Sequence, residues 1–564
     1  MCCMVDKIIN EEYMDLIIPN AILDSYSYAV NKTNINARYT LINVPKKTID
    51  VCELGDIYSF VPAIYTTEST VALDEIGVTK VRYEPEYELN GTGALIGIID
   101  SGINYLHPAF RYNDNTTKIQ AIWDQTINEG ATSGKDADFP YGTIYSKDKI
   151  NYALKQSNPL AVVPTDDKLG HGTMVAGIAV GSEDEENEFS GVAPLAELLV
   201  VKLKQAKKII KDIFSVPDDK ICFQESDIMM GIRFVLEKAK KLQRPLVICI
   251  ALGTNHGGEY GSGPLTNFLD LITTFPGVCS IISGGNEGNT GRHFFSKLTV
   301  QNSTKDILFH AGEKDKNFLI EIWPQFYQNI SFELVSPSGE TKTNINITID
   351  YRNLDIYKFY MGETYICIND VLAEVTRGRQ LILIRFVNIQ SGLWTIRFHS
   401  LDKINSALNA FLPSGNILSE DTYFIDADSF TTITSPGNST APITITSYDS
   451  VTGNISAFSS KGYSRANEIK PDLVAPGEDI TAPYQNNSYV SISGTGAAAA
   501  IVSGVIALIY EWSIIKGNFT NLSGTEIKTL LIQGAKRDPN VEYPNKTWGY
   551  GKVNLVGFFD KLTR

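Results

Sequence analysis

The chain has 564 residues, and at about 150 residues per domain this length predicts two to four domains. Hydrophobic residues make up 43% of the chain, which is enough to bury a sizeable core and excludes general disorder. Lys and Arg number 49 against 64 Asp and Glu, for a net charge of -15. So acidic a surface repels phosphate backbones and argues against nucleic acid as the main partner.

The cysteines and the N-terminus indicate where the chain is made. The seven cysteines are scattered without CxxC spacing, which argues against a disulfide framework or zinc knuckle and favours synthesis in a reducing compartment. The N-terminus, MCCMVDKIINEEYMDLIIP, has no basic segment followed by an apolar one, so we expect cytoplasmic synthesis without a signal peptide. The longest weakly polar run, Gly494 to Tyr510, is short for a membrane span and predicts a buried core helix.

The pattern along the chain changes three times. Residues 1–67 are predicted to form a first unit of strands and short helices. From 68 to 295, short apolar strands such as ALIGIID and PLVICIAL alternate with helical segments such as SDIMMGIRFVLEKAKKL, which predicts a doubly wound parallel sheet. Residues 296–428 show short strands and almost no helical period, typical of an inserted sandwich or jelly roll. The α/β pattern resumes over 429–564.

Four motifs carry candidate chemistry. The predicted strand in GIIDSGINYLHPAF ends at Asp100, and doubly wound sheets place functional groups at the carboxyl ends of their strands. A helix-capping Asp is the alternative interpretation of this residue. His171 begins a small-residue helix in GHGTMVAGIAVG, where a structural His is the alternative. Asn286 in SGGNEGN follows a buried strand, from which its amide can donate to a developing oxyanion. Residues 491–512 form a Gly-rich turn that enters an apolar helix.

In this order, the motifs resemble the Asp, His, Asn and nucleophile-turn order of the subtilisin-like serine proteases, peptidase family S8. The segment ALGTNHG resembles that family's substrate-binding edge strand, which implies contacts from Ala251, Leu252 and Gly253. The resemblance covers about 68–295 and 430–560. It implies an α/β fold, namely a subtilisin-like doubly wound parallel sheet with an N-terminal α+β prodomain and an inserted all-β jelly-roll domain.

Within that family the chain is similar to the clostridial germination-specific subtilases, the Csp family. These have a prodomain, a jelly-roll insertion and a small-residue run after the nucleophile turn, here Ala497 to Ala500. The resemblance implies a spore protein whose partners are a sister germination protease or the zymogen of a cortex hydrolase, with a small-molecule germinant as a further ligand. It also implies that some members regulate germination without catalysis. No cofactor or metal ligands are expected.

The sequence departs from the family at Gly496. The motif GTS reads GTG here, so the position of the nucleophilic serine has no side chain. Because that serine oxygen forms the acyl-enzyme, its loss predicts a pseudoprotease. Ser493 and Thr495 are not expected to replace it, and an engineered glycine is a further explanation.

Three hypotheses remain open from the sequence. The chain is a pseudoprotease that acts by binding, an active endopeptidase that uses another nucleophile, or a platform for a jelly-roll binding module. In subtilases the end of the prodomain lies in the cleft and is cut by the enzyme. We therefore expect the bond near Ile64 to Glu68 to survive in this chain and the prodomain to stay in the cleft.

Overall fold

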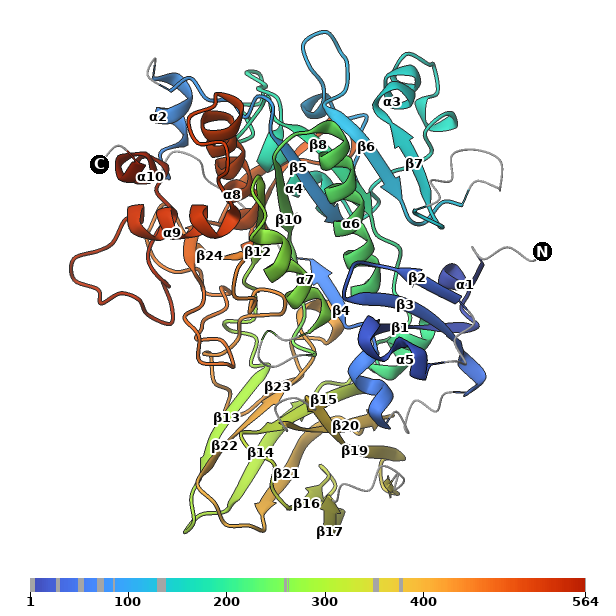
Figure 1. The fold of residues 1–564 in the computed structure, drawn as a ribbon. Coiled ribbons are helices and arrows are strands. Elements are labelled where there is room, and N and C mark those ends of the chain that lie inside the picture. The colour runs from blue at the N-terminus through green and yellow to red at the C-terminus, as the bar shows by residue number, and fades with distance from the viewer. Residues whose placement is uncertain are drawn as a thin grey trace.

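The computed structural model describes residues 6–26, 31–48, 55–67, 76–84, 87–128, 138–257, 261, 263–347, 355–374 and 379–562. Three parts are visible in Figure 1: a central α/β unit, a small N-terminal unit beside it and an all-β unit below both.

The centre of the molecule is an eight-stranded sheet. In spatial order its strands are β25 (Leu473–Pro476), β24 (Ile443–Tyr448), β12 (Val278–Ser283), β10 (Leu246–Ile250), β5 (Leu95–Asp100), β8 (Glu197–Lys202), β6 (Ile119–Asp124) and β7 (Thr143–Ser146). Neighbouring strands are parallel except for the edge pair β6 and β7, which is antiparallel. The sheet is therefore mixed, although the apolar runs predicted parallel strands.

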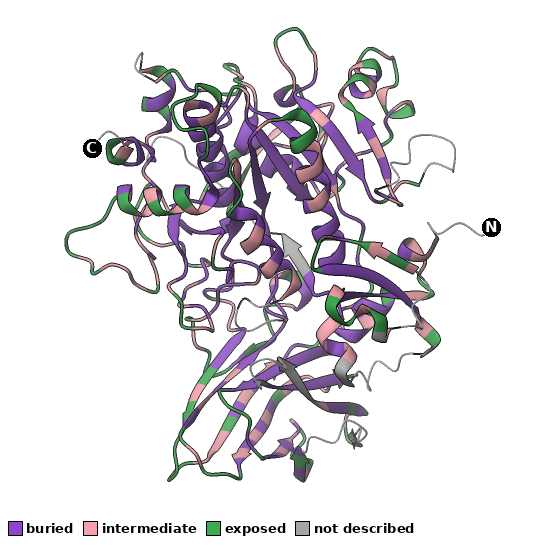
Figure 2. Ribbon diagram, viewed as in Figure 1, coloured by how far each residue is buried: buried purple, intermediate pink, exposed green. Residues whose placement is uncertain are grey.

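Helices cover both faces of this sheet, which explains why its strands are apolar at successive positions. In β5, Ile96 and Ile98 belong to the core under one group of helices, whereas Leu95 and Ile99 belong to the core under the other. The first group is α4 (His171–Val180), α8 (Thr495–Tyr510), α9 (Gly524–Gly534) and α10 (Leu555–Leu562). The second group is α6 (Glu225–Leu242) and α7 (Pro264–Thr273). The strands between them are buried along their length (Figure 2).

Helix α8 is the apolar helix that the sequence predicts after Gly494. With the π-helical segment that follows it, Thr495–Ile515 is the one helix in the described residues long and apolar enough to cross a membrane. Of its most apolar window, 83% is buried inside the protein. Every residue of α8 is buried against the central sheet and α4, so it has the surroundings of a core helix.

The N-terminal unit is an antiparallel sheet of three strands. Their spatial order is β1 (Tyr13–Pro19), β3 (Tyr39–Pro45) and β2 (Asn31–Asn34), with the short helix α1 (Asp6–Ile9) before them. One face of this sheet, through Ile17 and Leu41, packs against residues of α6. After the sheet, the chain continues through β4 (Ile64–Thr67), which pairs with strands of the α/β unit instead.

The all-β unit is a sandwich of two antiparallel sheets. The first is β13 (His293–Leu298), β22 (Ser406–Phe411), β15 (Asn317–Pro324), β20 (Arg379–Val387), β19 (Thr364–Glu374) and β18 (Asp355–Phe359). The second is β17 (Thr341–Ile347), β16 (Ile330–Val335), β21 (Gly392–Ser400), β14 (Thr304–Ala311) and β23 (Tyr423–Phe424). Aromatic side chains join the sheets: the ring of Phe386 in the first lies 5.4 Å from Phe309 and 5.7 Å from Trp394 in the second.

The sandwich shares one core with its neighbours. Its buried side chains are continuous with Leu16 and Ile42 of the N-terminal sheet and with α5 (Lys208–Ile213) of the α/β unit. Two buried hydrogen bonds cross the same boundary: Tyr58 donates to Glu321 over 2.9 Å, and Arg385 Nε donates to the Ile213 carbonyl over 3.0 Å. Burial of apolar side chains at this boundary stabilises the packing of the sandwich against the N-terminal sheet and the α/β unit.

We expect the two junctions of the sandwich, near residues 296 and 428, to resist limited proteolysis. The aromatic residues Trp323, Phe332 and Trp394 are buried in the shared core, so opening a junction exposes apolar surface. The measurement is a trypsin time course read by mass spectrometry. Rapid release of a stable fragment spanning about 296–428 would show a loosely tethered module.

Candidate active site

Two of the predicted residues meet at the carboxyl end of the central sheet. Asp100 is the last residue of β5, and His171 is the first residue of α4. His171 Nδ1 lies 2.8 Å from Asp100 Oδ1, and the side chains are 7% and 1% exposed. A carboxylate in this position fixes the orientation of the imidazole, leaving Nε2 as the nitrogen that would exchange a proton with a nucleophile.

A second carboxylate, Asp167, holds this pair in place. Its Oδ1 accepts from the Ser101 hydroxyl over 2.8 Å and from Gly170 N over 2.9 Å. Its Oδ2 accepts from the backbone N and the hydroxyl of Thr173, and Ser101 Oγ accepts from Gly172 N. The end of β5 is thereby bonded to the first turn of α4. The sequence analysis missed Asp167, although its place four residues before His171 was visible.

Asn286 lies in the loop after β12, and its side chain is anchored to the start of α8. Its Oδ1 accepts from Thr495 N over 2.9 Å and from the Thr495 hydroxyl over 3.1 Å. Because the oxygen is used in this way, the Nδ2 donor is the end of the amide that remains for a ligand. An amide donor near a nucleophile position can stabilise an oxyanion, the role that the sequence predicts for this residue.

Gly496 is the second residue of α8 and is buried. Thr495, beside it, has its hydroxyl bonded to Asn286 and to Gly285 N, so it is held away from the role of a nucleophile. Cys249 is a buried thiol on β10, and burial raises its pKa to about 12, which keeps it protonated. A protonated thiol is a poor nucleophile. Neither Thr495 nor Cys249 therefore supplies the nucleophile that Gly496 lacks.

The predicted substrate strand is occupied by the chain itself. Leu252 and Gly253 form β11, and Ala251 directly precedes them. Strand β4 pairs antiparallel with β11 on one side, Leu252 opposite Thr67 and Gly253 opposite Thr66. On its other side β4 pairs with β9 (Phe223–Gln224), which the sequence analysis missed. A backbone segment between two strands is how extended peptides are bound by strand addition. The residues after Thr67, up to 75, lie outside the described residues.

A buried carboxylate fixes the residue before β4. Glu225, the first residue of α6, accepts from Ala63 N over 3.4 Å and from Leu265 N over 3.0 Å. Burial raises the pKa of Glu225 to about 7. In the reverse direction, Glu225 N donates to the Ala63 carbonyl over 2.7 Å. The entry of β4 into the cleft is therefore held by both backbone and side-chain bonds.

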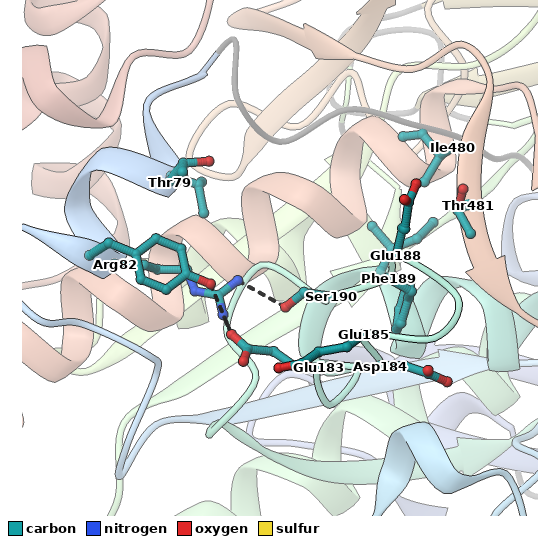
Figure 3. Close-up of a pocket in the computed structure, with 13 residues that line it drawn as sticks. Thr79, Arg82, Glu183, Asp184, Glu185, Glu188, Phe189, Ser190, Ile480 and Thr481 are labelled. Atoms are coloured by element: carbon teal, nitrogen blue, oxygen red, sulfur yellow. Dashed lines mark hydrogen bonds and ion pairs between the residues drawn. The ribbon is translucent and has the colours of Figure 1, made fainter.

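The chain that follows β4 is anchored again at α2 (Val78–Tyr83). Arg82 forms an ion pair with Glu183 and donates to the Ser190 hydroxyl over 2.9 Å and to the Gly191 carbonyl over 3.1 Å. Arg82, Glu183 and Ser190 line a cavity of about 520 Å³ between α2, the acidic loop 183–190 and Ile480 (Figure 3). Both ends of the segment that would be cut in a subtilase are thus fixed to the α/β unit.

Within the described residues, no group of three or more His, Cys, Asp or Glu side chains could hold a metal ion. Four cysteines, Cys222, Cys249, Cys279 and Cys367, are buried there and form no disulfide. Cys2, Cys3 and Cys52 lie outside the described residues.

Asp100 and His171 lie at the carboxyl end of the central sheet, and Gly496 lies in the first turn of the buried helix α8. This arrangement defines the class of protein. Residues 91–314 and 412–551 match the profile of the subtilase family, Peptidase_S8, and the chain belongs to that family. The expected subtilisin-like α/β fold is confirmed.

Among solved structures, the Clostridium perfringens CspB protease is similar to 86% of this chain and 96% of that one, at 30% identity and a TM-score of 0.76. The C5a peptidase of Streptococcus pyogenes serotype M3 is 22% identical over 443 residues, 75% of this chain and 35% of that protein. The PII-type proteinase of Lactococcus lactis subsp. cremoris is 22% identical over 601 residues, 96% of this chain and 29% of that protein. The chain spans about a third of the length of these curated relatives.

Proposed function

We propose that the chain is a catalytically disabled subtilase that acts by binding and regulates spore germination. The observation that carries the first part is Gly496 at the start of α8, in a chain whose Asp100 and His171 are paired. A His–Asp pair activates a hydroxyl but does not replace it, so acyl transfer from a bound peptide has no acceptor.

The second support is the strand in the cleft. Strand β4 fills the space between β9 and β11, where an extended substrate would pair with the enzyme. Because β4 is covalently joined to the rest of the chain, its effective concentration at the cleft is high and a competing peptide is disfavoured. A partner would therefore bind the outer surfaces of the protein.

The germination role rests on similarity to the CspB protease, which extends over 96% of that chain. The sister germination protease and the cortex-hydrolase zymogen are the partners that this role implies, and the spore is the location. A small-molecule germinant is a further ligand of this proposal.

The alternative function is an active serine endopeptidase that processes the zymogen of a cortex hydrolase. Two observations favour it: Asp100 and His171 keep a 2.8 Å contact, and Asn286 keeps an amide donor beside the site. In this alternative, a group other than residue 496 would act as the nucleophile.

Covalent labelling separates the two functions. We expect the purified chain to show no peptidase activity and no adduct with an active-site-directed fluorophosphonate, because position 496 has no oxygen. The measurement is the intact mass before and after the reagent, with an active subtilisin as positive control. A stoichiometric adduct that maps to the α/β unit would establish the endopeptidase.

A further inference from the structure

A cavity of about 720 Å³ lies where the sandwich meets the second half of the α/β unit. Strands β13 and β22 form one wall, and Figure 1 shows them side by side at the edge of the sandwich. The loops around residues 428–431, 464–467 and 546 form most of the rest, together with Thr299, Gln325 and Asn405. This volume suits an organic molecule and is far larger than a single inorganic ion needs. The cavity is distinct from the cleft that holds β4.

Three cations converge on this cavity in a chain whose net charge is -15. They are Lys297 on β13, Arg465 and Lys546, and the one carboxylate in the lining is Asp428. Asp428 Oδ1 accepts from Phe430 N over 2.8 Å. The side chains of Lys297 and Lys546 are exposed, and no ion pair to either is found among the described residues. In the lining, three cationic side chains therefore face one carboxylate, which leaves an excess of positive charge there.

Arg465 is held rigidly at the cavity wall. Its guanidinium lies 3.5 Å from the centre of the Phe411 ring, and Nη2 donates to the Asn255 carbonyl over 2.8 Å. An arginine fixed by stacking loses little conformational entropy when it binds an acid group. Neutral polar residues, Asn409 and Ser464 among them, also line the cavity.

We propose that this cavity binds a small organic anion with at least two acid groups. Lys297 and Lys546 bind separate acid groups through charge-assisted hydrogen bonds, and Arg465 orients the molecule between them. Because Asn255 follows β11 by two residues, a ligand on Arg465 sits one hydrogen bond away from the segment that pairs with β4. The proposal concerns a site outside the cleft and does not depend on whether the chain is a protease.

The test is calorimetric titration of the full chain with citrate at low ionic strength. We expect saturable binding of one citrate per chain, weakened at least tenfold by Lys297→Gln and by Lys546→Gln, and lost in the double variant. Added NaCl weakens the same binding because it screens the lysines. Lys314→Gln, an exposed lysine on the sandwich outside the cavity, is the matched control and leaves binding unchanged.

Triethyl citrate, which is neutral and carries the same skeleton, is expected not to bind. Both lysines are exposed, so their substitution leaves the core packing intact, and thermal unfolding checks that each variant is folded. Absence of saturable citrate binding would overturn the proposal. So would citrate binding that survives both substitutions or that triethyl citrate matches.

Discussion

Gly496→Ser is expected to produce a chain that cuts itself near the end of β4. The substitution places a hydroxyl at the second residue of α8, in a chain whose His171 is already paired with Asp100 at 2.8 Å. In subtilisin, removal of the nucleophile lowers kcat by about 10⁶-fold, equivalent to roughly 8–9 kcal/mol of barrier. Since β4 already lies in the cleft, we expect a gain of cleavage on the order of 10³ to 10⁶-fold.

The measurement is the intact mass of Gly496→Ser over time, with the cut expected between about residues 60 and 72. Gly496→Ala is the matched control, because it adds a Cβ without a hydroxyl and is expected to stay whole. His171→Ala in the serine background is expected to abolish the cut. A folded Gly496→Ser chain that stays whole would show that the rest of the site no longer supports catalysis.

The second large effect is expected at a buried ion pair between the N-terminal unit and the α/β unit. Lys207 Nζ contacts Asp15 Oδ1 at 2.6 Å, and the two residues are 1% and 0% exposed. Asn43 and Gln224 also donate to Asp15, and Gln224 belongs to β9, which pairs with β4. Removal of one partner leaves a buried charge, so Lys207→Met is expected to lower the free energy of unfolding by about 3–5 kcal/mol.

Urea unfolding followed by circular dichroism measures this loss. Lys208 is the matched control: it is the next residue, it pairs with Asp212 and Asp218, and its side chain is 51% exposed. Lys208→Gln is expected to move the midpoint little, because exposed ion pairs contribute little. Equal midpoints for the two variants would show that the N-terminal unit does not depend on the Asp15–Lys207 contact.

The sequence predicts those site residues that lie directly beside a recognisable apolar strand or helix. Asp100 ends an apolar strand, and His171 begins a run of small residues. Each residue therefore lies at the end of a strand or helix that one short stretch of sequence is enough to recognise. Gly496 is visible for the same reason, because it interrupts a motif at the start of an apolar helix.

The parts that the sequence does not show are made by distant segments. Strand β9 has two residues and no pattern of its own; it becomes a wall of the cleft only because β4 pairs with it from 160 positions away, Ile64 opposite Gln224. The Asp15–Lys207 pair joins residues 192 positions apart. The antiparallel edge strand β7 has only four residues, TIYS, and so short a segment is compatible with either strand direction. Long-range contacts of this kind leave no local signal.

The intact mass of the natural chain, made without other proteases, tests the central claim most directly. The claim is that Gly496 removes catalysis and that β4 therefore stays joined to the chain in its own cleft. The account predicts one species near 62.2 kDa that persists on incubation. A stable nick between about residues 60 and 72 under these conditions would contradict both parts of the claim.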